Sequence, residues 1–123
     1  MKELLLVFLG GGAGSIARYF LSKMYAVWQP VFPLATLTAN FLSCVIFGLV
    51  IMLGAEKFSI SPAIKLLMLT GFCGGFSTYS SFTYETVELF KSGNNVMAFS
   101  NILFNFLLSV TGLYLGAAIA KIL

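Results

Sequence analysis

Long apolar runs alternate with short polar interruptions along the whole chain. A membrane-spanning helix needs about 20 largely apolar residues, and this pattern supplies four such runs. The predicted helices are about Leu4–Tyr25, Leu34–Leu53, a third from Ser61-Pro62 to Lys91, and about Val96–Ile122. The predicted connections are Pro30 with Pro33, a polar loop with Gly54, Glu56, Lys57 and Ser59, and the turn Ser92-Gly93-Asn94-Asn95. Residues 1–123 are therefore expected to form one all-α transmembrane domain.

The third helix carries an interruption near its middle. Ser61-Pro62 is typical of a helix start, with Ser as N-cap and Pro at the first position. The stretch Thr70–Glu85 then contains three glycines and six Ser or Thr hydroxyls. Backbone at membrane depth leaves the helix only where protein or water receives its polar groups. We therefore expect a break within residues 71–81, with the helix resuming at about Phe82, and an ion or solute path beside it.

Composition supports a membrane protein and excludes several other classes. The chain is 59% hydrophobic and 9% charged, with mean hydropathy +1.00, whereas soluble domains carry about 25% charged residues. It has no histidine, no metal-ligand cluster, no Ser-His-Asp arrangement and no phosphate loop, so an enzyme is not expected. The net charge of +3 is scattered, which argues against nucleic acid as a partner. Cys44 and Cys73 are expected to be buried small hydrophobes.

Lysine and arginine show almost no bias between the two sides of the predicted bundle. Four spans place the N-terminus, the second connection and the C-terminus on one side, with Lys2, Lys57, Lys65 and Lys121. The other side holds Arg18, Lys23 and Lys91, so the count is four against three. Because this bias sets orientation, its absence favours insertion both ways and an antiparallel homodimer. Close helix packing is predicted where glycines lie four apart, at Gly10 with Gly14 and at Gly112 with Gly116.

Three sets of polar residues fall within the predicted spans. The sets are Thr36, Asn40 and Ser43 in the second helix, Asn101, Asn105 and Ser109 in the fourth, and the hydroxyl run from Ser77 to Thr83 in the third. A single such residue more often joins helices by hydrogen bonds, but three sets in one small protein favour a wetted, polar-lined path.

The lining chemistry favours an anion as the permeant. There is no Asp, and the four Glu residues fall near helix ends or in connections. Hydroxyl and amide donors with one cation, Arg18, suit an anion better than a cation. Tyr79 and Phe82 lie three apart, and the positive edge of an aromatic ring suits a small anion, although packing is the commoner role of such a pair.

Over essentially its full length, the sequence resembles the small bacterial fluoride channels of the CrcB or Fluc family. The markers are Gly10-x-x-x-Gly14 with Arg18, Thr36-Leu37-x-x-Asn40, and the long motif from Thr70 to Phe82 followed by Glu85. The resemblance implies a dual-topology antiparallel dimer in the bacterial cytoplasmic membrane. It also implies passive fluoride export through two pores, which protects the cytoplasm.

The resemblance also implies residue roles. Backbone carbonyls of Gly74 and Ser77 are expected to hold a structural sodium ion at the dimer centre. The implied fluoride-binding or pore residues are Asn40, Tyr79, Ser80, Ser81, Phe82 and Asn105. Arg18 is expected at a vestibule, and Glu85 and Ser109 beside the pore.

Two departures from the family pattern keep alternatives open. Tyr79 stands where Phe is usual, and Ala35 stands where Gly is frequent, so conductance is expected to differ. The alternatives are a non-conducting subunit or a heteromeric partner subunit of such a channel. A small multidrug cation exporter is less favoured, because that class needs a membrane-embedded carboxylate in the first helix, which here has none after Glu3.

Overall fold

The computed structural model describes residues 1–56 and 60–123, and these residues form helices with short connections and no strand. The elements are α1 (Lys2–Ala26), α2 (Leu34–Glu56), α3 (Pro62–Lys65), the π-helix η1 (Leu66–Cys73), α4 (Gly74–Phe76), α5 (Tyr79–Lys91) and α6 (Asn95–Ile122). Helices α1, α2 and α6 are long and apolar enough to cross a membrane. The chain is therefore a multi-pass helical membrane protein.

The connection after α2 differs from its prediction. Gly54 and Glu56 were expected in a polar loop but belong to α2, while Lys57 and Ser59 lie outside the described residues. The predicted helix start at Ser61-Pro62 is confirmed. The Ser61 hydroxyl accepts the Ile64 N–H at 3.3 Å, and Pro62 occupies the first turn, where no N–H is needed.

The predicted break exists, but its extent was wrong. Helical geometry continues to Phe76, and only Ser77 and Thr78 are extended before α5 begins at Tyr79, three residues earlier than expected. The Thr78 hydroxyl accepts the Ser81 N–H at 3.1 Å and caps α5, which lets the helix restart at once. Gly71 and Gly75, which precede it, stay helical and pack against the α1 backbone at Gly10 and Gly11.

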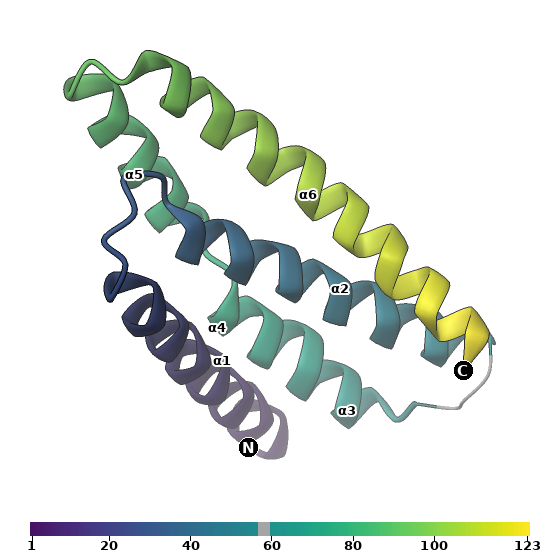
Figure 1. Cartoon of the computed structure of the whole chain (residues 1–123). Coiled ribbons are helices and arrows are strands. Elements are labelled where there is room, and N and C mark those ends of the chain that lie inside the picture. Colours follow the sequence, from purple (N-terminus) through teal and green to yellow (C-terminus); the bar gives the residue numbers. More distant parts are fainter. Residues whose placement is uncertain (57–59) are drawn as a thin grey trace.

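The helices form two packed pairs, and α5 continues from one pair to contact the other. Figure 1 shows α1 lying beside the α3–η1–α4 segment and α2 lying beside α6, in agreement with their contacts. Past the break, α5 packs against α6 instead. The break thus carries the third helical segment from one neighbour to the other and places the extended Thr78 against Asn40 of α2.

Glycine allows the backbones of both pairs to approach closely. A Cβ atom on Gly10 would lie 2.9 Å from the Phe72 nitrogen, and one on Gly112 would lie 2.8 Å from the Phe41 carbonyl oxygen. Gly14 and Gly116 face neighbouring backbone in the same way, so the predicted packing role of both glycine pairs is confirmed.

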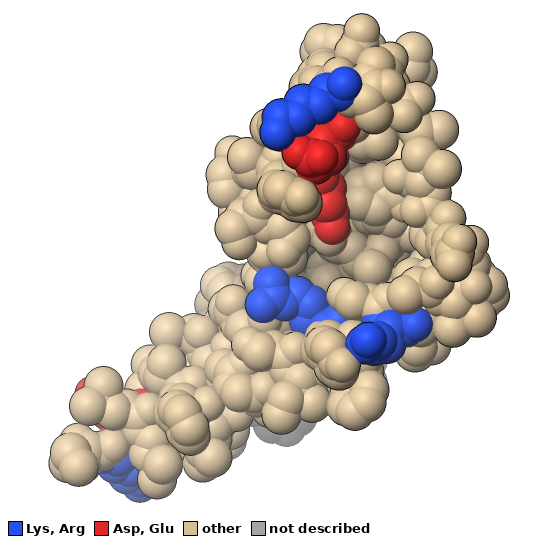
Figure 2. Space-filling view, turned by 90° about the vertical axis from the view of Figure 1, so that its left-hand side faces the viewer, with Lys and Arg blue, Asp and Glu red and all other residues tan. Residues whose placement is uncertain are grey.

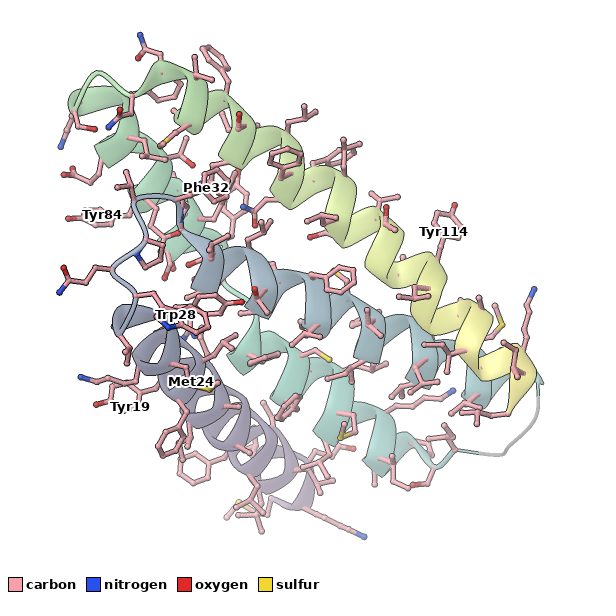
Figure 3. The ribbon with its side chains drawn as sticks, viewed as in Figure 1. Tyr19, Met24, Trp28, Phe32, Tyr84 and Tyr114 are labelled. Atoms are coloured by element: carbon pink, nitrogen blue, oxygen red, sulfur yellow. The ribbon has the colours of Figure 1, made fainter. Side chains whose placement is uncertain are left out.

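The outer surface is apolar and rich in aromatic residues. Figure 3 shows Tyr114 projecting from α6, and Tyr19, Met24 and Trp28 near the C-terminal end of α1. Trp28 is 75% exposed and packs edge-on to Tyr25 at 5.8 Å between ring centroids. Trp and Tyr at a helix end are typical of the membrane–water interface, which supports a lipid bilayer as the surrounding medium.

Candidate functional site

Asn40 on α2 holds the break in place. The Thr78 N–H donates to Asn40 Oδ1 at 2.8 Å, and Asn40 Nδ2 donates to the Thr78 carbonyl at 3.3 Å. The same Nδ2 donates to Asn105 Oδ1 at 2.9 Å, which links the break to α6. A backbone N–H released from a helix inside a membrane must find a partner, and the Asn40 amide supplies it.

Hydrogen bonds continue from Asn105 along α6 to α5. Asn105 Nδ2 donates to Asn101 Oδ1 at 2.8 Å, and Asn101 Nδ2 donates to the Thr86 hydroxyl at 2.9 Å. Thr86 donates in turn to the Phe82 carbonyl at 2.7 Å. Asn101 is fully buried and Thr86 is 7% exposed, so this part of the network lies away from water and lipid.

The other predicted polar residues of α2 also bond to the third segment. Thr36 donates to Glu85 Oε1 at 2.7 Å, and Ser43 donates to the Cys73 carbonyl at 3.1 Å. Glu85 Oε2 is buried without a partner within the described ranges. The interhelical bonds expected for polar residues are therefore present, and lining a cavity is an additional role for only some of them.

Five of the predicted pore or pore-adjacent residues meet at one cavity. It has a volume of about 350 Å³ and is lined by Asn40, Tyr79, Phe82, Ile102, Asn105, Phe106 and Ser109. A neighbouring cavity of about 220 Å³ is lined by Asn40, Cys44, Ser77, Thr78, Tyr79 and Ser109.

The aromatic pair and one hydroxyl give this cavity its character. The Tyr79 and Phe82 rings lie 5.5 Å apart between centroids, and Tyr79 is 80% exposed. The Ser109 hydroxyl borders both cavities and has no hydrogen-bond partner in the described part of the chain. Among the described residues no acidic side chain lines either cavity, and the walls combine amide and hydroxyl groups with ring surfaces, the aliphatic Ile102 and the Cys44 thiol.

Ser80, Ser81 and Arg18 lie outside both cavity linings. Ser80 and Ser81 occupy the first turn of α5, with their hydroxyls 3.3 and 3.1 Å from the Thr78 hydroxyl. Arg18 lies half-buried on α1.

Charged side chains gather on one face of the molecule. In Figure 2, acidic side chains lie against a basic one on the face shown, and further basic side chains lie across a hollow. One ion pair is Lys91 to Glu88 at 3.0 Å, and a cavity of about 460 Å³ borders Glu85 and Glu88.

The two predicted metal-ligand carbonyls have lost their regular helical donors. In an α-helix the N–H of residue i+4 bonds the carbonyl of residue i. For Gly74 that donor is the Thr78 N–H, which bonds Asn40 Oδ1, and for Ser77 it is the Ser81 N–H, which bonds the Thr78 hydroxyl. The Ser77 hydroxyl is itself directed to the Cys73 carbonyl at 2.8 Å. The backbone at Gly74 and Ser77 therefore fits a carbonyl-bound cation.

Sequence reasoning gave no individual role to three residues that build this site. Thr78 caps α5 and bonds Asn40, and Asn101 and Thr86 extend the amide network. Thr78 and Asn101 had been placed only in polar sets. Thr86 lies one turn after Phe82 on the same helix face, and that spacing was the available signal.

The fold and site define a class: a multi-pass helical membrane protein with a polar cavity beside a break in one helix. The chain belongs to the family described as CrcB-like protein, Camphor Resistance (CrcB), which matches residues 5–117. It is 39% identical over 121 residues to a fluoride-specific ion channel FluC of Pyrococcus abyssi, covering 98% of each chain. It is 41% identical over 122 residues to the protein of that name from Gloeothece citriformis, again covering 98% of each.

Proposed function

We propose that this chain forms a fluoride-selective channel that lets fluoride leave the cytoplasm passively and so protects the cell from fluoride toxicity. The observation that carries the proposal is the cavity beside the break, where Asn40, Tyr79, Phe82, Asn105 and Ser109 meet. The names of the similar proteins, which describe fluoride-specific ion channels, support the same conclusion. The role is conduction rather than catalysis.

The chemistry of the cavity suits a small, hard anion. Such an ion must exchange its water for donors that hold it without trapping it. Asn40 contributes an amide whose N–H groups bond Asn105 Oδ1 and the Thr78 carbonyl, and Ser109 contributes a hydroxyl with no partner among the described residues. Tyr79 and Phe82 contribute ring edges with partial positive charge. Ser80 and Ser81 continue the hydroxyl track along the first turn of α5, and Arg18 attracts anions at the entrance.

The channel is an antiparallel dimer of four-span subunits inserted in both orientations in a bacterial cytoplasmic membrane. The segmented helix from Pro62 to Lys91 is the third span. The count of four basic residues against three supports dual topology. Tyr79 is 80% exposed on one copy although it lines the cavity, so a second copy is needed to close the site.

A structural sodium ion belongs at the centre of this dimer. The carbonyls of Gly74 and Ser77 would hold it, because their regular helical donors bond elsewhere. Such an ion would supply positive charge that stabilises the carbonyl dipoles at the break. Glu85 and Ser109 lie beside the pore and shape its polarity.

One observation favours a second candidate, a non-conducting or heteromeric partner subunit. Asn40, Asn101 and Asn105 all bond to protein groups, as residues with a packing role would. A cation exporter has no such support, because the acidic residue of α1 is Glu3 in its first turn.

The deciding experiment is fluoride efflux from liposomes that contain only this purified chain, read with a fluoride electrode, with chloride efflux as the control. Fast fluoride release without chloride release supports a selective channel of one subunit type. No release from a folded dimer favours the partner subunit. Substituting Ser81 or Phe82 then separates the roles, because a channel loses flux while still assembling and a packing subunit loses assembly.

A further inference from the structure

The network from Asn40 to Thr86 has a fixed direction, because a backbone group determines each of its ends. At one end the Thr78 N–H only donates, so the Asn40 atom that faces it at 2.8 Å must be the carbonyl oxygen. The Asn40 NH₂ group is thereby turned toward Asn105, whose facing atom at 2.9 Å must accept.

The other end fixes the same direction independently. The Phe82 carbonyl only accepts, so the Thr86 hydroxyl must donate its single proton to it, at 2.7 Å. The same hydroxyl must therefore accept from Asn101. The Asn105 NH₂ group also lies 3.1 Å from the Asn101 carbonyl, which again only accepts. The side-chain amides of Asn40, Asn105 and Asn101 therefore all point the same way along the hydrogen-bonded network.

This direction bears on which ion the cavity accepts. An amide presents an electron-rich oxygen at one end and N–H donors at the other in almost the same shape, so its orientation decides whether it repels or attracts an anion. The bond from Asn40 Nδ2 to the Thr78 carbonyl, at 3.3 Å, is the longest in the network. That N–H group is the one most easily exchanged from protein to an anion.

We propose that Thr86 and Asn101 are positioning residues for anion selectivity. They hold the amides of Asn105 and Asn40 so that Asn40, which lines the cavity, keeps its NH₂ group on Asn105 Oδ1 and the Thr78 carbonyl, from where an N–H can turn to an anion. Neither residue lines a described cavity, so they act through Asn105 and Asn40. The inference rests on the proposed function, since it names the residues that orient the donors of that same site.

The test compares threonine variants in the liposome assay. Thr86→Val keeps the shape of the side chain but removes the hydroxyl, whereas Thr86→Ser keeps the hydroxyl. Thr111→Val is the matched control, because the Thr111 hydroxyl makes the same kind of bond to the Leu107 carbonyl, at 2.8 Å, on an exposed face of α6 with no amide attached.

Thr86→Val removes the hydroxyl that accepts from the buried Asn101 amide. This variant should therefore release fluoride about tenfold more slowly than the wild type and show a higher ratio of chloride to fluoride release. Thr86→Ser should restore both values to near those of the wild type, and Thr111→Val should leave them unchanged. In an Asn105→Ala background, Thr86→Val should cause no further loss, because the connection to Asn40 is already cut.

Several results would overturn the inference. A Thr86→Val variant that matches wild type in both rate and ion ratio would do so, as would equal losses in Thr86→Val and Thr86→Ser. Losses that multiply in the Asn105→Ala background would assign Thr86 to packing. Failure of both Thr86→Val and Asn101→Leu to yield folded dimer on gel filtration would assign the pair to folding. Absence of fluoride flux from the wild-type chain is a separate result, which would overturn the proposed function and this inference with it.

Discussion

Replacing Gly14 by alanine should separate α1 from the α3–η1–α4 segment. A Cβ atom at this position would lie 2.8 Å from the Phe76 nitrogen and 3.0 Å from the Phe72 carbonyl carbon. Both are backbone atoms, so no side-chain rotation relieves the contact and one of the two helical segments must move. Gly12 is the matched control on the same helix, because its Cβ would meet no heavy atom within 4 Å.

The magnitude follows from the difference between the two variants. Each exchanges glycine for alanine within α1 and gains about 1 kcal/mol of helix propensity, which cancels in the comparison. Overpacking of a close contact costs about 1–3 kcal/mol, and rigid backbone on both sides places Gly14→Ala near the upper end. We therefore expect Gly14→Ala to be about 3 kcal/mol less stable than Gly12→Ala.

The assay is thermal unfolding in detergent, followed by the amount of folded protein that remains on gel filtration. Gly12→Ala should unfold at or above the wild-type temperature and Gly14→Ala well below it. The fluoride flux of Gly14→Ala should also fall, because Phe76 directly precedes the extended Ser77 and Thr78 and moves with its helix.

Equal unfolding temperatures for Gly14→Ala and Gly12→Ala would refute the reasoning. That result would mean that the two helical segments separate freely and that close backbone contact does not hold the break in position. A loss confined to Gly12→Ala would place the close contact on the opposite face of α1.

Three further predictions concern the break itself. Tyr79→Phe should conduct fluoride at a rate equal to or above that of the wild type. The ring contact with Phe82 remains, and the removed hydroxyl has no partner in the described part of the chain. Loss of flux would show that the hydroxyl takes part in conduction. Thr78→Val removes the cap of α5 and should lower stability by about 1 kcal/mol, whereas Thr78→Ser should not, as measured by thermal unfolding. Replacing sodium by a bulky organic cation should slow fluoride efflux from liposomes if the Gly74 and Ser77 carbonyls hold the ion, and an unchanged rate would argue against a sodium site.

Much of the fold could be predicted from the sequence because a membrane leaves few choices. Backbone groups in lipid must bond within their own helix, so the apolar runs gave α1 and α6 nearly to their ends. Gly10 and Gly14 predicted a close contact because only glycine allows two helix backbones to approach so closely. Ser61 before Pro62 predicted a helix start, since both act within a single turn.

The extent of the break could not be predicted from local composition. Glycine and hydroxyl residues over residues 71–81 suggested a long interruption, yet Gly74 and Gly75 are helical because they lie in the segment that packs against α1. The interruption narrows to Ser77 and Thr78 because Asn40, 38 residues away in sequence, receives the Thr78 N–H.

The sequence by itself determined that this chain crosses a membrane, where its helices run apart from the end of α2 and the start of α5, and which polar residues lie within them. Those features depend on the length of apolar runs and on contacts within a turn. Only the tertiary structure decided which polar residues bond one another, such as Thr36 with Glu85 and Asn101 with Thr86. It also decided that Asn40, Asn105 and Ser109 face one cavity. The physical reason is that these partners belong to different helices, and their meeting depends on how each helix is rotated and shifted against its neighbours.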